Sequence, residues 1–168
     1  MIRICDHLDK EMSRKLENRT YRSMRSSINL GKIEGGINTY VVPSLCRIEI
    51  DRRLLPEEDN DEAFLEIQNV IKNSGEPESS FIIKKLRGTN GYSGKEDSDL
   101  VKSISKSYNK IVGSPIEFIN AVGASDGRYF SCDDIEIVNF GPGIGSEGHS
   151  VNESVEIKKL LELSLIHI

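Results

Sequence analysis

The amino-acid sequence predicts two folded parts, an α+β part followed by an incomplete α/β part. In residues 1–88, a helical pattern precedes strand, strand, helix and strand patterns, an order that suits an antiparallel sheet with helices on one face. In residues 89–168, helical and strand patterns alternate, which is typical of an α/β fold. A polar stretch over residues 87–95 predicts the boundary between the two parts.

The elements of the first part are predicted by the spacing of apolar residues. Over residues 4–16 apolar side chains recur every four positions, which is the stripe of an amphipathic helix. Residues 27–34 and 40–52 alternate between apolar and polar, so each should form a half-buried strand. A helix over residues 56–75 with acids in its first turn comes next, and then a strand over residues 80–85.

The second part is predicted to alternate between helices and strands. A helix is expected over residues 100–112, and a strand over residues 116–119 follows it. A short helix should begin after Asp126, before a strand over residues 135–140. The last expected element is a helix over about residues 153–163.

Composition excludes several classes of protein. The formal net charge of the 168 residues is -5, and their 22 Lys and Arg are interleaved with acids, which argues against a nucleic-acid partner. No run of about 18 apolar residues occurs, so no membrane association is expected. Cys5, Cys46 and Cys132 are far apart and lack Cys-x-x-Cys spacing, which favours reduced thiols and a cytoplasmic location.

One histidine is the best candidate for chemistry. His149 lies in a glycine-rich loop that begins at Gly141, between a predicted strand and a predicted helix. Neutral imidazole is the commonest side-chain metal ligand, and a loop anchored by two regular elements can aim it. A zinc site takes about three or four protein ligands, and the chain has three histidines. Either partner ligands come from elsewhere, or the metal interpretation is wrong.

Three other patterns have simpler explanations than chemistry. Residues 143–148 fit the dinucleotide-binding pattern G-x-G-x-x-G, but no second strand follows in the sequence. His7 and Asp9 have a spacing that paired metal ligands use, but residues two apart on a helix point to different faces. Glu57 and Glu58 resemble a general base beside a ligand carboxylate, yet acids in a first helical turn compensate the helix dipole.

Two further positions leave a structural and a functional interpretation open. Ser125 and Asp126 lie where a strand should lead into a helix, so they either cap that helix or belong to a loop that binds substrate. Arg53 follows the second predicted strand, and its rigid guanidinium suits a substrate carboxylate. A surface ion pair with Asp51 or Glu49 is the simpler explanation for Arg53 alone.

Three segments in combination resemble a known enzyme family. In their order and spacing they are similar to the acetylornithine deacetylase, succinyl-diaminopimelate desuccinylase and aminoacylase family of co-catalytic metallopeptidases. The resemblance covers nearly the whole chain. The segments are Gly-Gly to Val-Val-Pro (35–43), Asp-Arg-Arg-Leu-Leu-Pro (51–56), and Gly-Ala-Ser-Asp-Gly-Arg (123–128) followed by the glycine loop (141–153).

The resemblance implies a fold and a set of partners. In this family a catalytic α/β domain holds two zinc or cobalt ions, and an inserted α+β lid closes over the substrate and often forms the dimer surface. Residues 1–88 would be most of the lid, and residues 89–168 would be the last part of the catalytic domain. A homodimer through the lid is therefore expected.

The resemblance also assigns residues. His149 matches the final metal ligand of the family. Arg53 matches the lid arginine that helps to bind the substrate carboxylate. By the same resemblance, the loop residues Gly123, Ala124 and Ser125 would contact substrate. The residues that would support the site are Asp126, Arg128 and Glu153, with Glu153 beside His149.

The family's other functional residues precede the lid and have no counterpart in this sequence. They are a His-x-Asp strand, paired glutamates that act as general base and ligand, and a further carboxylate ligand. We therefore expect the chain to be a fragment that contains no catalytic residue and is inactive alone. Its last residues, 163–168, resemble a translated adapter, so both ends are expected to be artificial.

Hydrolysis of the amide bond of N-acyl amino acids or small peptides is the function that the resemblance implies for the intact protein. A metal-bridged water, deprotonated by a glutamate, would attack the carbonyl carbon. The alternative is a non-catalytic dimerisation module. An edge strand, either residues 27–34 or residues 80–85, would then pair across a two-fold axis.

Overall fold

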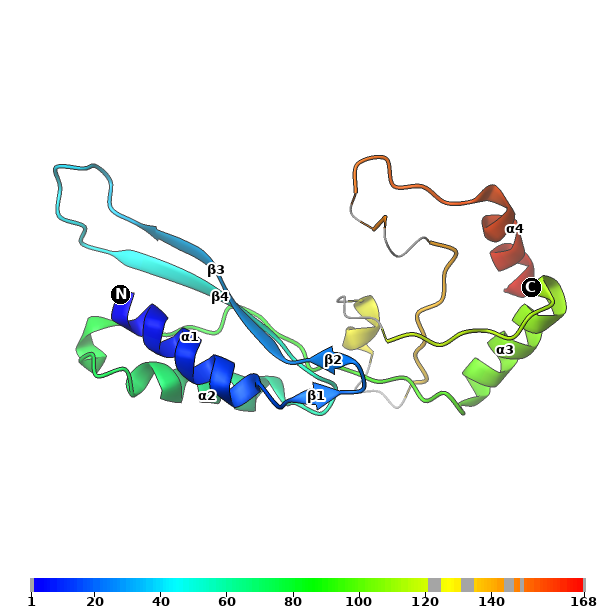
Figure 1. Ribbon diagram of the computed structural model, residues 1–168, viewed down its shortest axis with the longest axis horizontal. Coiled ribbons are helices and arrows are strands. Elements are labelled where there is room, and N and C mark those ends of the chain that lie inside the picture. Colours follow the sequence, from blue (N-terminus) through cyan, green and yellow to red (C-terminus); the bar gives the residue numbers. More distant parts are fainter. Residues whose placement is uncertain (1, 121–124, 131–134, 144–146, 149, 168) are drawn as a thin grey trace. The chain divides into compact units, whose positions relative to one another are not determined.

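A computed structural model describes residues 2–120, 125–130, 135–143, 147–148 and 150–167 (Figure 1). The chain divides into two compact units, Met1–Tyr92 and Ser93–Ile168. The assignment of such parts to a lid and to a catalytic domain, with a boundary after residue 88, stays a prediction. No helix among the described residues is long and apolar enough to cross a membrane.

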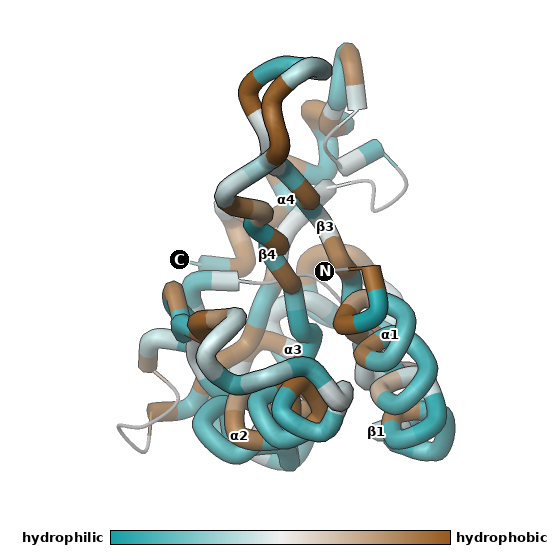
Figure 2. Tube along the Cα trace, turned by 90° about the vertical axis from the view of Figure 1, so that its left-hand side faces the viewer, coloured by the Kyte–Doolittle hydropathy of each residue, from teal (hydrophilic) through white to brown (hydrophobic). Residues whose placement is uncertain are grey.

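Two helices form the core of the first unit. Helix α1 (Ile2–Leu16) buries Ile4, Leu8, Met12 and Leu16, which is the stripe that the sequence predicts. Helix α2 (Asn60–Lys72) contributes three more core residues. They are Ile67, Val70 and Ile71. Figure 1 shows α1 and α2 side by side below the long hairpin, and Figure 2 shows that hydrophilic residues dominate the rest of both helices.

The hairpin consists of strands β3 (Ser27–Gly35) and β4 (Cys46–Arg53), which pair antiparallel. Both predicted strands are confirmed at these positions, although residues 40–45 are not part of β4. A register shift between Leu30 and Lys32 leaves Gly31 as the extra residue. Side chains alternate between the two faces of a sheet, so the extra residue returns Ile33 to the face that holds Leu30. Ile28, Leu30 and Ile50 on that face pack against the helical core.

A second, short hairpin leads into β3. Strands β1 (Thr20–Tyr21) and β2 (Met24–Arg25) pair antiparallel, and Arg22 in the turn has a φ of 54°. These two strands are not predicted from the sequence. Two residues are too few to show a period, so alternation cannot identify them.

The predicted strand over residues 80–85 is not a strand in the structure. A 3-10 helix, η1 (Glu78–Ser80), comes first, and Phe81 then adopts an extended backbone conformation. Phe81 and Ile83 pack against the core, whereas Ile82 between them is exposed. The alternation that predicts a strand is therefore real, but a strand also needs a hydrogen-bonded neighbour, and none pairs with this segment among the described residues.

Helix α2 begins later than the sequence predicts. Asp59 is the N-cap, because its side chain accepts hydrogen bonds from the backbone N–H groups of Asp61 (2.8 Å) and Glu62 (3.1 Å). Glu57 and Glu58 precede this cap, so their interpretation as acids of the first helical turn is wrong. The acids that do lie in the first turn are Asp61 and Glu62.

In the second unit, α3 (Asp99–Val112) and α4 (Ile157–Ile166) pack against each other. Helix α3 confirms the helix predicted over residues 100–112, and the 3-10 helix η2 (Asp126–Tyr129) confirms the short helix after Asp126. The last helix begins a few residues after position 153. The strands predicted over residues 116–119 and 135–140 are absent, since no described segment of this unit pairs with them.

The N-terminal end of α3 also contacts the segment after residue 134. Ser98 caps α3, with its Oγ accepting from the N–H of Val101 at 3.2 Å. The Glu136 carboxylate accepts from the N–H groups of Asp99 (3.3 Å) and Leu100 (2.8 Å) at the same helix end. An acid at a helix N-terminus is favourable, because it faces unpaired N–H groups and the positive end of the dipole.

The first unit is a small α+β fold with two-stranded antiparallel sheets and helices, and the described residues of the second unit form helices. The α+β lid-type class that the sequence predicts is confirmed, with α1 and α2 providing the apolar partner for one face of the β3–β4 hairpin.

Candidate functional site

Arg53, the predicted carboxylate-binding residue, lies at the end of β4 on the outward face of the hairpin. Its side chain is 58% exposed, and its Nε donates to Asp51 Oδ2 at 2.7 Å. Asp51 shares this face, because residues two apart in a strand point the same way. Among the described residues, Asp51 is the acceptor that the Arg53 side chain contacts, so Nη1 and Nη2 have no protein acceptor there.

The ion pair that forms the simpler explanation of Arg53 is therefore present. It does not exclude the functional explanation, because it uses Nε and leaves the outer edge of the guanidinium open. An arginine held at one edge can still bind a carboxylate through its terminal nitrogens.

The remainder of the outward face is also charged. Lys32 contacts Glu34 (2.8 Å) and Glu49 (3.9 Å), and Arg47 contacts Glu49 (3.4 Å). The Lys32 amine lowers the pKa of the exposed Glu34 carboxyl. This face is thus a solvated ladder of opposite charges, as the alternation of the two predicted strands indicates.

Arg52, the neighbour of Arg53, points to the opposite face and is buried. Its side chain is 7% exposed. The Nη2 group donates to Glu58 Oε1, and the Nη1 group donates to the carbonyl oxygens of Arg53 and, at 3.5 Å, of Ser27. Because Ser27 and Arg53 are register partners, Arg52 binds both strands at the last rung of the hairpin.

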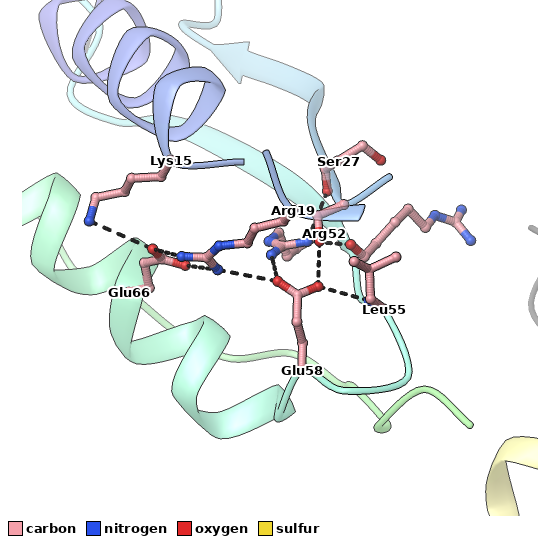
Figure 3. Close-up of polar contacts among 9 residues, drawn as sticks. Lys15, Arg19, Ser27, Arg52, Leu55, Glu58 and Glu66 are labelled. Carbon is pink, nitrogen blue, oxygen red and sulfur yellow. Dashed lines mark hydrogen bonds and ion pairs between the residues drawn. The ribbon is translucent and has the colours of Figure 1, made fainter. Parts of the chain in front are cut away.

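Glu58, which accepts from Arg52, also accepts hydrogen bonds from other segments of the first unit (Figure 3). Its Oε2 accepts from Ser26 Oγ at 2.5 Å and from the Leu55 N–H at 2.8 Å, and Arg19 Nη1 lies 3.2 Å from its Oε1. Burial raises the pKa of the Glu58 carboxyl, but the hydrogen bonds from Ser26 and Leu55 and the charge of Arg52 outweigh burial. The pKa therefore lies below its usual value.

Arg19 connects Glu58 to helix α2. Its two terminal nitrogens bind the Glu66 carboxylate at 2.7 and 2.9 Å, and Lys15 lies 3.6 Å from the same carboxylate. The hydrogen bond to Glu66 is the main reason that the pKa of Arg19 is raised. These side chains border a groove of about 690 Å³ on the first unit. Both signs of charge line it, so it has no clear preference for an anion or a cation.

In the second unit, Ser125 caps η2, with its Oγ accepting from the Gly127 N–H at 3.3 Å. The capping explanation of Ser125 is thus present, and Asp126 lies in the first turn. Arg128 stacks on the ring of Tyr129, with Cζ 4.8 Å from the ring centroid, and its Nη2 donates to the Tyr129 hydroxyl at 3.0 Å. The substrate and supporting roles of Ser125, Asp126 and Arg128 stay predictions.

The other predicted residues of this unit are only partly described. Gly123, Ala124 and His149 lie outside the described residues. Glu153 is exposed and precedes α4. Its expected role beside His149 stays a prediction.

Glu147, which the sequence analysis does not single out, holds the segment around it together. Its carboxylate accepts from the N–H (3.1 Å) and the hydroxyl (2.8 Å) of Ser154, and its carbonyl accepts from the Ser150 hydroxyl at 2.6 Å. Glu147 is therefore tied to Ser150 and Ser154, which precede α4.

The described residues do not form a metal site by themselves. No group of three or more His, Cys, Asp or Glu side chains is close enough there to hold an ion. His7 and Asp9 both lie on α1, where Asp9 is exposed. The donor set that a bound zinc or cobalt ion requires is thus not present in the described part of the chain.

Sequence reasoning missed Arg52, Glu58 and Arg19 as partners. One signal was available: Arg52 occupies a position that continues the inward-facing series of Cys46, Ile48 and Ile50. A charge at an inward-facing position needs an opposite charge, because burial without a partner is costly. The sequence does not say which acid supplies that charge.

Comparisons with known proteins agree with this fold. Residues 1–79 match the family model described as M20 peptidase dimerisation domain. The chain is 24% identical, over 151 residues, to N-formyl-4-amino-5-aminomethyl-2-methylpyrimidine deformylase from Halalkalibacterium halodurans, covering 82% of this chain and 35% of that protein. The chain therefore spans about a third of the length of this curated relative.

A solved structure has a similar fold. It is the M20 family metallo-carboxypeptidase Sso-CP2 from Sulfolobus solfataricus, with a TM-score of 0.61 and 17% identity. The match covers 94% of this chain and 40% of that chain. At this identity the match shows the fold alone. Together with the family model it confirms the resemblance that the sequence indicates: residues 1–79 match the peptidase dimerisation domain of M20 enzymes.

Proposed function

We propose that the chain contributes a lid and the last part of a catalytic domain to a metal-dependent amidohydrolase. The substrate is an N-acyl amino acid or a small peptide, and the reaction cleaves its amide bond. The dimerisation domain match supports a hydrolase of the M20 type. The relatives are a deformylase and a metallo-carboxypeptidase, and both names denote hydrolysis of an amide bond.

The geometry of Arg53 is the observation that supports a substrate with a free carboxylate. Asp51 accepts from Nε, and the exposed guanidinium keeps its terminal nitrogens available to a ligand. These nitrogens fit the two oxygens of a carboxylate, which N-acyl amino acids and peptides carry at the end distal to the acyl group. The chain's net charge of -5 gives no broad attraction for such an anion, so a placed arginine is needed.

Residues of the second unit complete the proposal. His149 is one metal ligand, for zinc or cobalt, and Gly123, Ala124 and Ser125 form the loop that meets substrate. Asp126, Arg128 and Glu153 support these groups. Further ligands and the general base are supplied by residues outside this chain, so we propose that the chain alone is inactive.

The protein acts as a homodimer through the first unit. The outer edge of β3 has no partner strand among the described residues, and exposed edges pair readily with a second copy. Large apolar side chains are also exposed at and near the hairpin tip, where Figure 2 shows several hydrophobic stretches beyond β3 and β4. These side chains are Ile33, Ile37, Tyr40, Val42 and Leu45.

The same surface favours a second candidate function, a dimerisation module without catalysis. Activity separates the two candidates.

Cys5 and Cys46 are free thiols, which is compatible with the proposed cytoplasmic location.

The experiment that tests the proposal uses a longer chain that includes the coding sequence upstream of Met1. Release of amino acid from a panel of N-acetyl and N-succinyl amino acids is measured for this chain, for the longer chain and for its Arg53→Ala variant. Arg47→Ala is the matched control, because Arg47 is an ion-paired arginine on the same face.

We expect activity in the longer chain only. Arg53→Ala should lower kcat/KM by about 10- to 100-fold, as loss of a charge-assisted hydrogen bond predicts. Arg47→Ala should change it less than about 2-fold. A longer chain that hydrolyses none of the panel, and yet forms a dimer, would contradict the amidohydrolase and support the module.

A further inference from the structure

The end of β4 is held from behind by two charged residues. Arg52 is nine-tenths buried and donates to two carbonyl oxygens on the two strands, one of which is the carbonyl of Arg53 itself. Strand ends fray unless their last groups are bonded, so this side chain fixes the backbone at the point from which Arg53 projects.

Glu58 in turn fixes Arg52. It accepts from Arg52 Nη2 at one oxygen, and from Ser26 and the Leu55 N–H at the other. The residues between strand and helix are thereby closed back onto the hairpin. Its side chain is 14% exposed, so water competes little for these contacts.

Arg52 and Arg53 lie on opposite faces of β4. Consecutive residues of a strand point to opposite faces, so Arg52 reaches inward toward Glu58 while Arg53 reaches outward. The rotation of the strand end about its own axis determines where the Arg53 guanidinium lies. Asp51, two residues earlier, restrains the same guanidinium at Nε.

We propose that Arg52 and Glu58 are positioning residues for Arg53, so that the inner ion pair sets the direction in which the outer arginine meets a substrate carboxylate. This inference rests on the proposed function of Arg53. It adds that specificity for a free carboxylate depends on residues that never contact the substrate.

The test compares substrates that differ only in the carboxylate. For the longer chain, kcat/KM is measured with an N-acetyl amino acid and with the corresponding N-acetyl amino acid amide, and their ratio is the carboxylate selectivity. Glu58→Gln keeps the size of the side chain but loses its charge. Glu57→Gln is the matched control, because Glu57 is adjacent and exposed.

We expect Arg53→Ala to lower the selectivity most, and Glu58→Gln to lower it by about 10-fold, mainly through KM of the acid substrate. In an Arg53→Ala background, Glu58→Gln should have no further effect on the selectivity. A purely structural role would lower kcat/KM equally for both substrates and would leave the selectivity intact, which overturns the inference.

The outcomes separate the two proposals. If Arg53→Ala leaves the selectivity unchanged, the proposed role of Arg53 fails. If Arg53→Ala lowers it and Glu58→Gln does not, only the positioning role fails.

A measurement on the 168-residue chain keeps the inference testable without activity. The Nε–H resonance of Arg53 in the NMR spectrum reports its hydrogen bond to Asp51. Its ¹⁵N relaxation should show greater mobility in Glu58→Gln than in Glu57→Gln. Ser26→Ala, which removes one contact of Glu58, is the milder variant if Glu58→Gln does not fold. Equal Arg53 mobility in every folded variant would overturn the inference.

Discussion

At the scale of single residues, Glu58 couples the stability of the first unit to pH. Its pKa in the folded chain is below its usual value, which is about 4.3 in an unfolded chain. A lowered folded pKa means that the ionised carboxylate stabilises the fold above about pH 4.3, and that this contribution is lost as the pH falls through the folded pKa.

Replacing Glu58 tests this dependence. Glu58→Gln should lower the free energy of unfolding at pH 7 by about 1–3 kcal/mol, because Arg52 then keeps a buried charge without its counter-ion. The difference from the unmodified chain should shrink as the pH is lowered through and below about 4. Urea unfolding of both proteins between pH 3 and pH 7 measures it. Glu57→Gln is the control, and an equal loss at every pH would contradict the ionic explanation.

The N-cap of α3 provides a second residue-scale prediction. Ser98→Ala removes the acceptor for the Val101 N–H and should destabilise the second unit by about 1 kcal/mol. Ser103→Ala is the matched control, because Ser103 is exposed in the interior of the same helix, where alanine is the better helix former. Thermal unfolding followed by circular dichroism measures both. Equal effects would mean that Ser98 does not act as a cap.

The sequence predicted Arg53 and its partner Asp51, because the two lie two positions apart on one strand face. It could not predict Arg52 with Glu58 in the same way. The partners of Glu58 include Arg19 and Ser26, which are 39 and 32 positions away. Only the folded chain brings these residues together. In the sequence, the position of Glu58 shortly after Pro56 was also consistent with a role at a helix dipole.

At the scale of elements, the packing of α1 on α2 and on the hairpin is the main source of stability for the first unit. Leu8 and Met12 are its fully buried large side chains among the described residues. Leu8→Ala should cost about 2–5 kcal/mol, since it removes buried methyl groups and leaves a cavity. Leu65→Ala on α2, at a side chain 55% exposed, should cost much less. Comparable losses in denaturant unfolding would contradict this placement of the core.

Helices were predicted better than strands, and the reason is physical. A helix satisfies its hydrogen bonds within one segment, so the apolar stripe of α1 was enough to identify it. A strand needs a neighbour, and the segments over residues 80–85, 116–119 and 135–140 carry strand patterns without one in the described chain. Residues 27–35 and 46–53 became strands because each provides the partner for the other.

At the scale of the whole molecule, we propose that the chain supplies only part of an active site. Residues 1–79 match a peptidase dimerisation domain, whereas the metal centre is proposed from His149 and the loops of the second unit. The sequence could identify the family from short motifs because these motifs are continuous in the chain. It could not identify a ligand set, because such sets are gathered from segments that lie far apart.

Metal stoichiometry is the most direct test of this central claim. Zinc and cobalt are measured by elemental analysis after dialysis of three proteins: the present chain, the longer chain with its upstream coding sequence, and the longer chain carrying His149→Ala. We expect no tightly bound metal on the present chain, about two ions on the longer chain and fewer on its His149→Ala variant. Two ions on the present chain, or none on the longer one, would contradict it.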